Sequence, residues 1–325
     1  MIQHYSGPLG NFQYDDTEFQ LRNDYLYYIG TETDGSKIKI PVGITDCSLM
    51  FSSCSSLVEV PTIPAGVTNC CGMFVNCTSL VRAPIIPKSV TNCKSMFEGC
   101  SSLVEASTIP EGVTNCESMF YGCRSLLNAP AIPKGATNCN GMFYGCRSLI
   151  KAPEIPAGVT DCVAMFSDCH SLSKAPEIPA GATNCAHMFH GCSSLLTAPE
   201  IPTGVTDCYG MFFGCGSLTE APEIPAGVED CGCMFYNCSS LLKAPVIPVG
   251  VEDCHSMFYG CDSLMRAPKI PTGVTDCNSM FCGCSSLQNY SLIVAKSMTY
   301  YNCSPIIQEI DSFIQKFKER NQLNA

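Results

Sequence analysis

Two series of cysteines repeat along the chain with a constant step of 23 residues. Each cysteine of the first series is followed seven residues later by one of the second, and a Met-Phe pair lies between them in every repeat. A repeat this short cannot bury an apolar face alone, so the period predicts a solenoid in which each unit stacks on its neighbours. The first series is Cys47, Cys70, Cys93, Cys116, Cys139, Cys162, Cys185, Cys208, Cys231, Cys254 and Cys277.

Each repeat divides into three segments, as the unit from Ala152 to Lys174 shows. The Ala-Pro-x-Ile-Pro segment is expected to be extended, because proline fixes φ and disfavours helix in the residue before it. The Gly-Val-Thr-Asn/Asp-Cys segment is expected to turn at its glycine and continue as a short strand. The Cys-x-x-Met-Phe-x-x-Cys segment has apolar residues at helical spacing, which predicts one turn of α-helix or 3-10 helix.

The repeat resembles the BspA-like leucine-rich repeats, also called Treponema pallidum-type repeats. The likeness lies in the pattern Ser-Leu-x-x-x-x-x-Ile-Pro-x-x-Val-Thr-x-x-x-x-x-Phe-x-x-Cys, which recurs over residues 40 to 290. The chain departs from the family pattern in three ways: methionine precedes the phenylalanine, cysteine replaces a small Ile-Gly-like pair, and proline follows alanine, as in Ala83-Pro84. The resemblance implies a right-handed coil of leucine-rich-repeat type and a surface-exposed adhesion module without enzymatic activity.

We therefore expect a β-rich solenoid of eleven repeats with short parallel strands over residues 40–291. Residues 1–39 lie outside the period and are expected to form a β cap, with strands near residues 11–14, 18–21 and 25–29 and a hairpin turn at Asp34-Gly35. Alternatively, their tyrosines form a docking surface. Residues 292–325 are expected to hold a degenerate last repeat and a capping helix that starts at Ser304-Pro305. Tethering to a partner is the alternative role of this helix.

Charge and hydrophobicity exclude several classes of function. The net charge of −11 argues against a nucleic-acid partner, because phosphate binding needs clustered basic residues. The chain has no run of 18 apolar residues, so no membrane insertion is expected. The N-terminal sequence lacks a basic start followed by an apolar run, so no signal peptide is expected.

The 26 cysteines allow three interpretations. A structural zinc site requires paired cysteines at short spacing, whereas Cys231-x-Cys233 and Cys282-x-Cys284 are isolated pairs, so neither a metal nor a cofactor is predicted. Disulfides between the two series would staple each coil. Buried free thiols that stack as small apolar side chains are the favoured interpretation, with Cys71, Cys233 and Cys282 outside the pattern and exposed.

The sequence carries no recognisable catalytic arrangement. Its five histidines belong to no repeated nucleophile or carboxylate pattern, and phosphate-loop, zinc-protease and calcium-repeat motifs are missing. The repeats have no insertions that would build a cleft, so no enzymatic activity is predicted; a polysaccharide-acting solenoid enzyme is the alternative. The Asn or Asp before each first-series cysteine suggests either calcium binding or side-chain capping of a turn, and the frequent Asn favours capping.

Variable positions that face outward are the candidates for ligand binding. One set follows the Met-Phe pair and the other follows the second cysteine, and both contain the Tyr, Arg and His that would form a stripe along one edge. The alternative is that the rings only cover neighbouring coils. A second stripe, Glu154, Glu177, Glu200 and Glu223, is interpreted as a solubilising face. The candidate binding residues are Tyr121, Tyr144, His190, Phe213, Tyr236, Tyr259, Arg124, Arg147 and His170.

Together these features predict a non-enzymatic scaffold that binds a protein or host-surface ligand. Its expected location is a cell surface or a virion, with assembly in the cytoplasm. The alternative is a structural spacer or decoration subunit of a larger assembly such as a phage virion, which would dock through residues 1–39 or the C-terminal helix.

Overall fold

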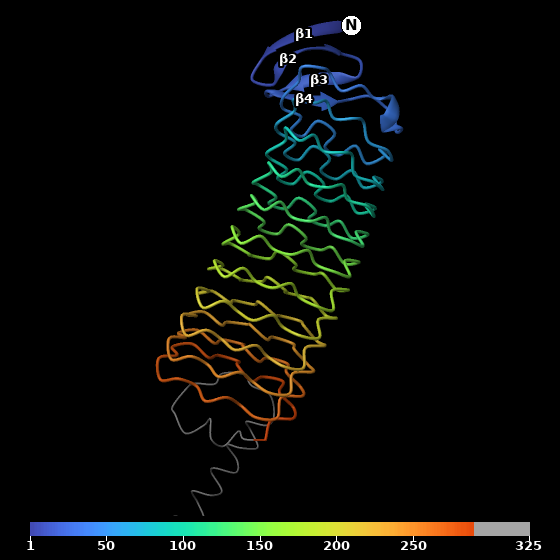
Figure 1. Cartoon of the computed structure of the whole chain (residues 1–325). Helices are drawn as coiled ribbons and strands as arrows, with labels where there is room; N and C mark the ends of the chain where they lie inside the picture. Colours follow the sequence, from blue (N-terminus) through green and yellow to red (C-terminus); the bar gives the residue numbers. More distant parts are fainter. Residues whose placement is uncertain (289–325) are drawn as a thin grey trace, which may run out of the picture.

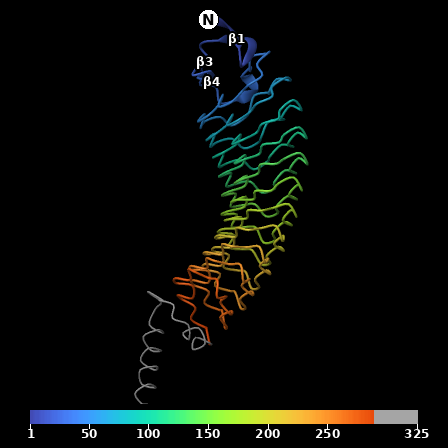
Figure 2. The same cartoon turned by 90° about the vertical axis from the view of Figure 1, so that its left-hand side faces the viewer.

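The computed structural model describes residues 1–288, so the expected C-terminal helix lies outside the described residues. The repeats stack one on another into an elongated column, which bends along its length (Figures 1 and 2). Equivalent residues of adjacent repeats form parallel bridges, such as Asp46 with Asn69 and Asn69 with Asn92. A second line of parallel bridges includes Arg82 with Glu105.

The repeats contain less β-structure than the sequence predicts. From residue 40 to residue 288 the parallel bridges are isolated, and no named strand or helix occurs. The bridges of the second line do not extend into strands, because the Ala-Pro-x-Ile-Pro segment beside them supplies few backbone donors and a turn follows it. The repeats are held together by side-chain packing and by backbone hydrogen bonds between adjacent coils, such as Cys47 N–H to Asn69 O at 2.9 Å and Leu49 N–H to Cys71 O at 2.9 Å.

The Cys-x-x-Met-Phe-x-x-Cys segment is not helical, which corrects the expected helical turn. Met50 N–H donates to Cys47 O at 3.2 Å within a turn, whereas Phe51 N–H donates to Met73 O of the next coil at 2.9 Å. Leu49 and Ser53 have φ values of 58° and 64°, and the equivalent residues of the later repeats are also left-handed. A left-handed residue ends a right-handed helix and suits a type II turn, so the segment is a series of turns.

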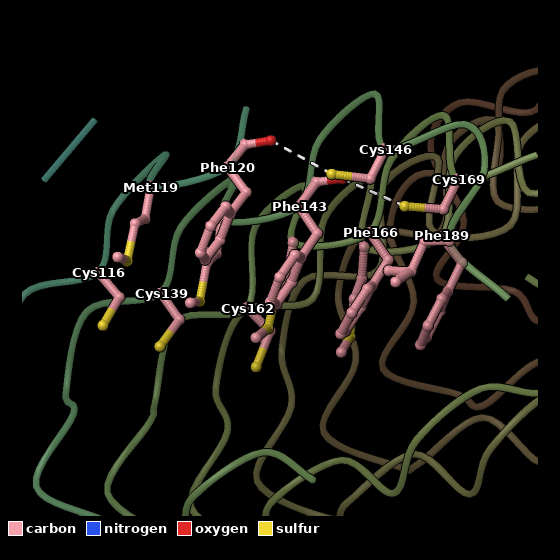
Figure 3. Close-up of a cluster of buried hydrophobic side chains, with 14 of the residues drawn as sticks. Cys116, Met119, Phe120, Cys139, Phe143, Cys146, Cys162, Phe166, Cys169 and Phe189 are labelled. Carbon is pink, nitrogen blue, oxygen red and sulfur yellow. Dashed lines mark hydrogen bonds between the residues drawn. The ribbon is translucent and has the colours of Figure 1, made fainter. Parts of the chain in front are cut away.

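One side of these turns forms a continuous core. In each central repeat the Met-Phe pair, both cysteines and the following leucine are fully buried. The phenylalanine rings stack from coil to coil with centroids 5.5 to 5.9 Å apart, as Figure 3 shows for Phe120 to Phe189. From Cys77 onward each second-series thiol also donates to a phenylalanine carbonyl of the preceding coil, such as Cys146 Sγ to Phe120 O at 3.2 Å (Figure 3).

Within residues 1–288 no cysteine of the two series is disulfide-bonded. Cys71 and Cys233 are half-buried, and Cys54 is as well. The exposure expected for Cys282 is wrong, because this residue is only 4% exposed and is disulfide-bonded.

The N-terminal residues form two antiparallel hairpins. Strand β1 (Ile2–Gly7) pairs with β2 (Gly10–Asp15), and β3 (Phe19–Arg22) pairs with β4 (Tyr25–Tyr28). The sequence indicated strands at the positions of β2, β3 and β4 but missed β1. Asp34-Gly35 is not a hairpin turn: Asp34 caps the short 3-10 helix η1 (Gly35–Lys37), and its carboxylate accepts the Ser36 N–H at 3.1 Å.

The second hairpin covers the first phenylalanine of the column. The rings of Phe19 and Tyr28 lie 6.5 Å and 5.3 Å from that of Phe51, and Phe51 is fully buried. Tyr28 N–H donates to Met50 O at 2.7 Å. The apolar end of the stack is therefore shielded from water at this side.

Candidate functional site

The Cys-x-x-Met-Phe-x-x-Cys segment, which we call the turn segment, presents three variable positions on the outside of the column. They are the two residues after the first cysteine and the residue after Met-Phe. In the third repeat they are Lys94, Ser95 and Glu98, which are half-buried, whereas Met96 and Phe97 between them are fully buried. The core is buried without these side chains, and the residue type at these positions differs from repeat to repeat.

The residues after Met-Phe form an aromatic column on the outer surface. Tyr121 and Tyr144 stack with ring centroids 4.5 Å apart, and the other four rings stack at 4.4 to 4.5 Å with nearly parallel planes. Tyr121 and Tyr259 are the most exposed, at 38% and 36%, and the remaining rings are half-buried. The aromatic column comprises Tyr121, Tyr144, His190, Phe213, Tyr236 and Tyr259.

A polar gap divides the aromatic column into two stacks. Ser167 occupies the equivalent position between Tyr144 and His190 and is buried. Asp168 lies in the same gap, with its carboxylate 3.8 Å from His190 Nδ1. Burial, and after it the negative charge of Asp168, raise the pKa of the Tyr144 hydroxyl. The expected single stripe is therefore interrupted.

Arg124, Arg147 and His170 occupy one position in three consecutive coils. Their backbones are linked from coil to coil, since Ser148 N–H donates to Arg124 O at 3.2 Å. Both arginines are exposed and His170 is half-buried. Within residues 1–288 their side chains show no ion pair and no ring contact with the aromatic column. The structure thus arranges them as a separate basic column of three residues.

The acidic stripe lies on the Ala-Pro-x-Ile-Pro segments. All four glutamates are exposed. Open grooves run between these segments of adjacent repeats, and one of them is lined by Glu223, Pro245 and Val246 among others. A partner that contacted this face would meet charged and proline side chains, and no aromatic ring of residues 1–288 lines that groove.

The Asn or Asp before each first-series cysteine caps a turn, as the capping interpretation predicts. In all eleven repeats its Oδ1 accepts the N–H of the residue two positions later, for example Asn69 from Cys71 at 3.1 Å. Some amides also link coils, since Asn92 Nδ2 donates to Asn69 Oδ1 at 3.0 Å. We call this line of residues the Asx ladder.

The last four members of the Asx ladder are all aspartates: Asp207, Asp230, Asp253 and Asp276. Carboxylates cannot donate to one another, so this part of the ladder lacks the amide links of the earlier coils. Burial, and to a lesser degree the charges of Asp253 and Asp207, raise the pKa of Asp230. Negative charge therefore accumulates at this end of the ladder.

A Cys-His-Asp contact, which the repeat pattern did not indicate, lies beside these aspartates. Cys233 Sγ lies 3.5 Å from His255 Nε2, and His255 Nδ1 lies 2.9 Å from Asp253 Oδ1. Backbone bonds join residues 22 apart, and Cys233 N–H donates to His255 O at 2.8 Å. A search for functional side chains 22 residues apart would have paired Cys233 with His255.

The buried thiols are unsuited to nucleophilic chemistry. Burial raises the pKa of Cys100 and of Cys238 to about 12. The thiolate is the reactive form of cysteine, and it is scarce near neutral pH at such a pKa. The two cysteine series therefore serve the core.

Comparison with known families gives one match. The model described as "BspA type Leucine rich repeat region (6 copies)" matches residues 31–150, 136–263 and 209–319. No curated protein and no solved structure matches the chain. In the part of the chain that the structure describes, no helix has the length and hydrophobicity needed to cross a bilayer.

Proposed function

Because the chain belongs to the BspA-type leucine-rich repeat family, whose model covers most of its length, we propose that it is a protein-binding scaffold that recognises its partner through the aromatic column. The observation that carries this proposal is the outward stacking of rings at a variable position, beside buried positions that hardly vary. Core residues repeat because stacking demands it, whereas outward rings are not required to hold the coils together.

The chemistry of the aromatic column suits protein recognition. Tyrosine is enriched in binding hot spots, and aromatic side chains bury a large area with few rotatable bonds. Stacking on neighbouring rings restricts the side chains before a partner arrives, which lowers the entropy lost on binding. Arg124 and Arg147 add exposed positive charge at the same level of the stack as Tyr121 and Tyr144.

We place the partner at a cell surface, in keeping with an adhesion role, and assign no catalysis to the protein. The experiment measures binding of the fluorescently labelled full-length chain to intact cells, before and after the cells are treated with protease. Loss of binding after this treatment is expected if the partner is a protein. Unchanged binding would contradict a protein partner.

Matched variants identify the face that binds. The first replaces all six residues of the aromatic column by serine, which already occupies this position as Ser52 and Ser167. The second replaces the four glutamates of the acidic stripe by threonine, which stands there as Thr62 and Thr108. We expect the serine variant to lose binding and the threonine variant to keep it. The reverse result would assign recognition to the acidic face.

A further inference from the structure

We propose that His255, Asp253 and Asp276 bind a divalent transition-metal ion on the outer surface of the last described coils. One ligand atom of each residue lies within 4.8 Å of the other two, and all three residues are half-buried. Ligands bound about 2.1 Å from an ion lie up to about 4.2 Å apart across it. Small side-chain movements therefore suffice to close the site around a metal.

The position of the His255 ring supports this assignment. The ring lies over Gly232, where a Cβ atom would come within 2.6 Å of His255 Cε1. Its Nδ1 is directed at Asp253, and its Nε2 lies 3.5 Å from Cys233 Sγ. Metal-binding histidines commonly hold their second ring nitrogen in a hydrogen bond, which fixes the ring and its tautomer. Cys233 is placed to do this for His255.

The Asx ladder supplies a second reason. In the early coils the amide of one residue donates to the oxygen of its neighbour, as Asn69 Nδ2 does to Asp46 Oδ2 at 2.9 Å. Asp253 and Asp276 are consecutive ladder members without an amide donor between them. Each uses its Oδ1 to cap a turn, accepting the N–H of His255 at 2.8 Å and of Asn278 at 2.9 Å. A bound cation would offset the repulsion between the two carboxylates.

The donor set indicates the class of metal. Calcium and magnesium prefer sites made only of oxygen, whereas an imidazole favours zinc, nickel, copper or cobalt. One imidazole and two carboxylates leave at least one coordination position for water, as in zinc sites with three protein ligands. The sequence pattern predicted no metal, because the cysteine pairs are isolated and the Asn or Asp before each first-series cysteine was interpreted as a turn cap.

The test is isothermal titration calorimetry of Zn²⁺ into the full-length protein. Metals are first removed with a chelator, and the buffer contains a non-chelating reductant. The variants are His255→Asn and Asp276→Asn. Asparagine already occupies the first position as Asn140 and the second as Asn92, so both variants are expected to fold. The matched control is Asp161→Asn. Asp161 occupies the same ladder position as Asp253, but the residue two positions later is Val163 where the site has a histidine.

We expect the wild-type protein and the Asp161→Asn control each to bind one equivalent of Zn²⁺ at this site. The affinity of His255→Asn and Asp276→Asn for this ion should be at least about tenfold lower. Comparison with the variants separates this site from binding by the many thiols, which all four proteins share. Co²⁺ should give no thiolate charge-transfer absorption at this site, because Cys233 is not a ligand. Equal Zn²⁺ affinity in wild type and His255→Asn, or no binding by wild type, would overturn the proposal.

Discussion

At the scale of single residues, the thiol combines two properties that the core requires. From Cys77 onward each second-series cysteine fills apolar space and also donates to a backbone carbonyl, as Cys238 Sγ does to Phe212 O at 3.1 Å. Valine would fill the space but remove this second donor to a carbonyl that also accepts the Cys215 N–H at 3.1 Å, and serine would bury a more polar group in a smaller volume. The cysteine series is thus explained by packing and hydrogen bonding, without disulfides.

Burial of the thiols predicts that stability falls in alkaline solution. Burial raises the pKa of Cys238 to about 12 in the folded chain, whereas the pKa of a thiol in the unfolded chain lies near its ordinary value of 9.0. Between these values the unfolded state binds fewer protons, so the free energy of unfolding decreases as pH rises from 9 to 12. Each such thiol contributes up to about 1.4 kcal/mol per pH unit in this window.

Urea denaturation followed by circular dichroism at pH 8 to 11 measures this effect. Cys238→Ala removes one titrating thiol, so its stability should fall with pH less steeply than that of the wild type. The difference isolates the thiol from tyrosine and lysine ionisation, which both proteins share. A wild-type stability that does not change between pH 9 and pH 11 would show that the thiols are accessible to water or oxidised.

At the scale of the element, the turn segment depends on left-handed residues. The position before the second cysteine has positive φ throughout, and glycine occupies it in most repeats, for example Gly145 at 70°. Ser53 and Asp168 occupy the same position at 64° and 57°. Side chains are therefore tolerated there but strained, because L-residues pay a cost in the left-handed region.

Gly145→Ala is expected to lower the free energy of unfolding by about 1–2 kcal/mol for this reason. Gly135→Ala is the matched control, because Gly135 has no positive φ and an added Cβ would meet only Glu111 O at 3.5 Å. Serine fills that position in another repeat as Ser89. The control should keep or slightly raise stability in urea denaturation. Equal loss in both variants would contradict the left-handed requirement.

The turn segment also shows how far the sequence predicts this fold. The 23-residue period and the buried Met-Phe pairs could be predicted, because stacking requires identical residues in adjacent coils. The helical turn could not be distinguished from successive turns, since both place Met96 and Phe97 inward. The positive φ of Ser95 and His187 was missed, although glycine occupies the same position in other repeats as Gly72, Gly141 and Gly210.

The same distinction applies to the candidate sites. The residues of the aromatic column could be predicted from the sequence, because they all occupy the variable position after Met-Phe. The interruption of the column could also be predicted there, because Ser167 occupies the same position in its repeat. The cluster of Cys233, His255 and the aspartates was missed because each repeat was considered by itself. Asp253 and His255 lie in one coil, whereas Cys233 and Asp276 reach them from the neighbouring coils.

At the scale of the whole molecule, the stack divides the chain into invariant buried positions and variable outward ones. The inward side holds the phenylalanine ladder and both thiol series. The outward side holds the aromatic column, the basic column and the aspartates of the Asx ladder. The N-terminal hairpins shield one end, where Phe19 and Tyr28 cover Phe51. Recognition by the outer columns depends on this division being correct.

Thiol labelling tests this division most directly, because it reports which residues face inward. The native protein is treated with iodoacetamide without reductant, and labelled residues are identified by mass spectrometry before and after unfolding. For residues 1–288 we predict rapid labelling of the half-buried Cys54, Cys71 and Cys233, protection of the buried thiols, and their labelling after unfolding. Two results would contradict this division: rapid labelling of both cysteine series in the native protein, or no labelling of these cysteines after unfolding because they form disulfides.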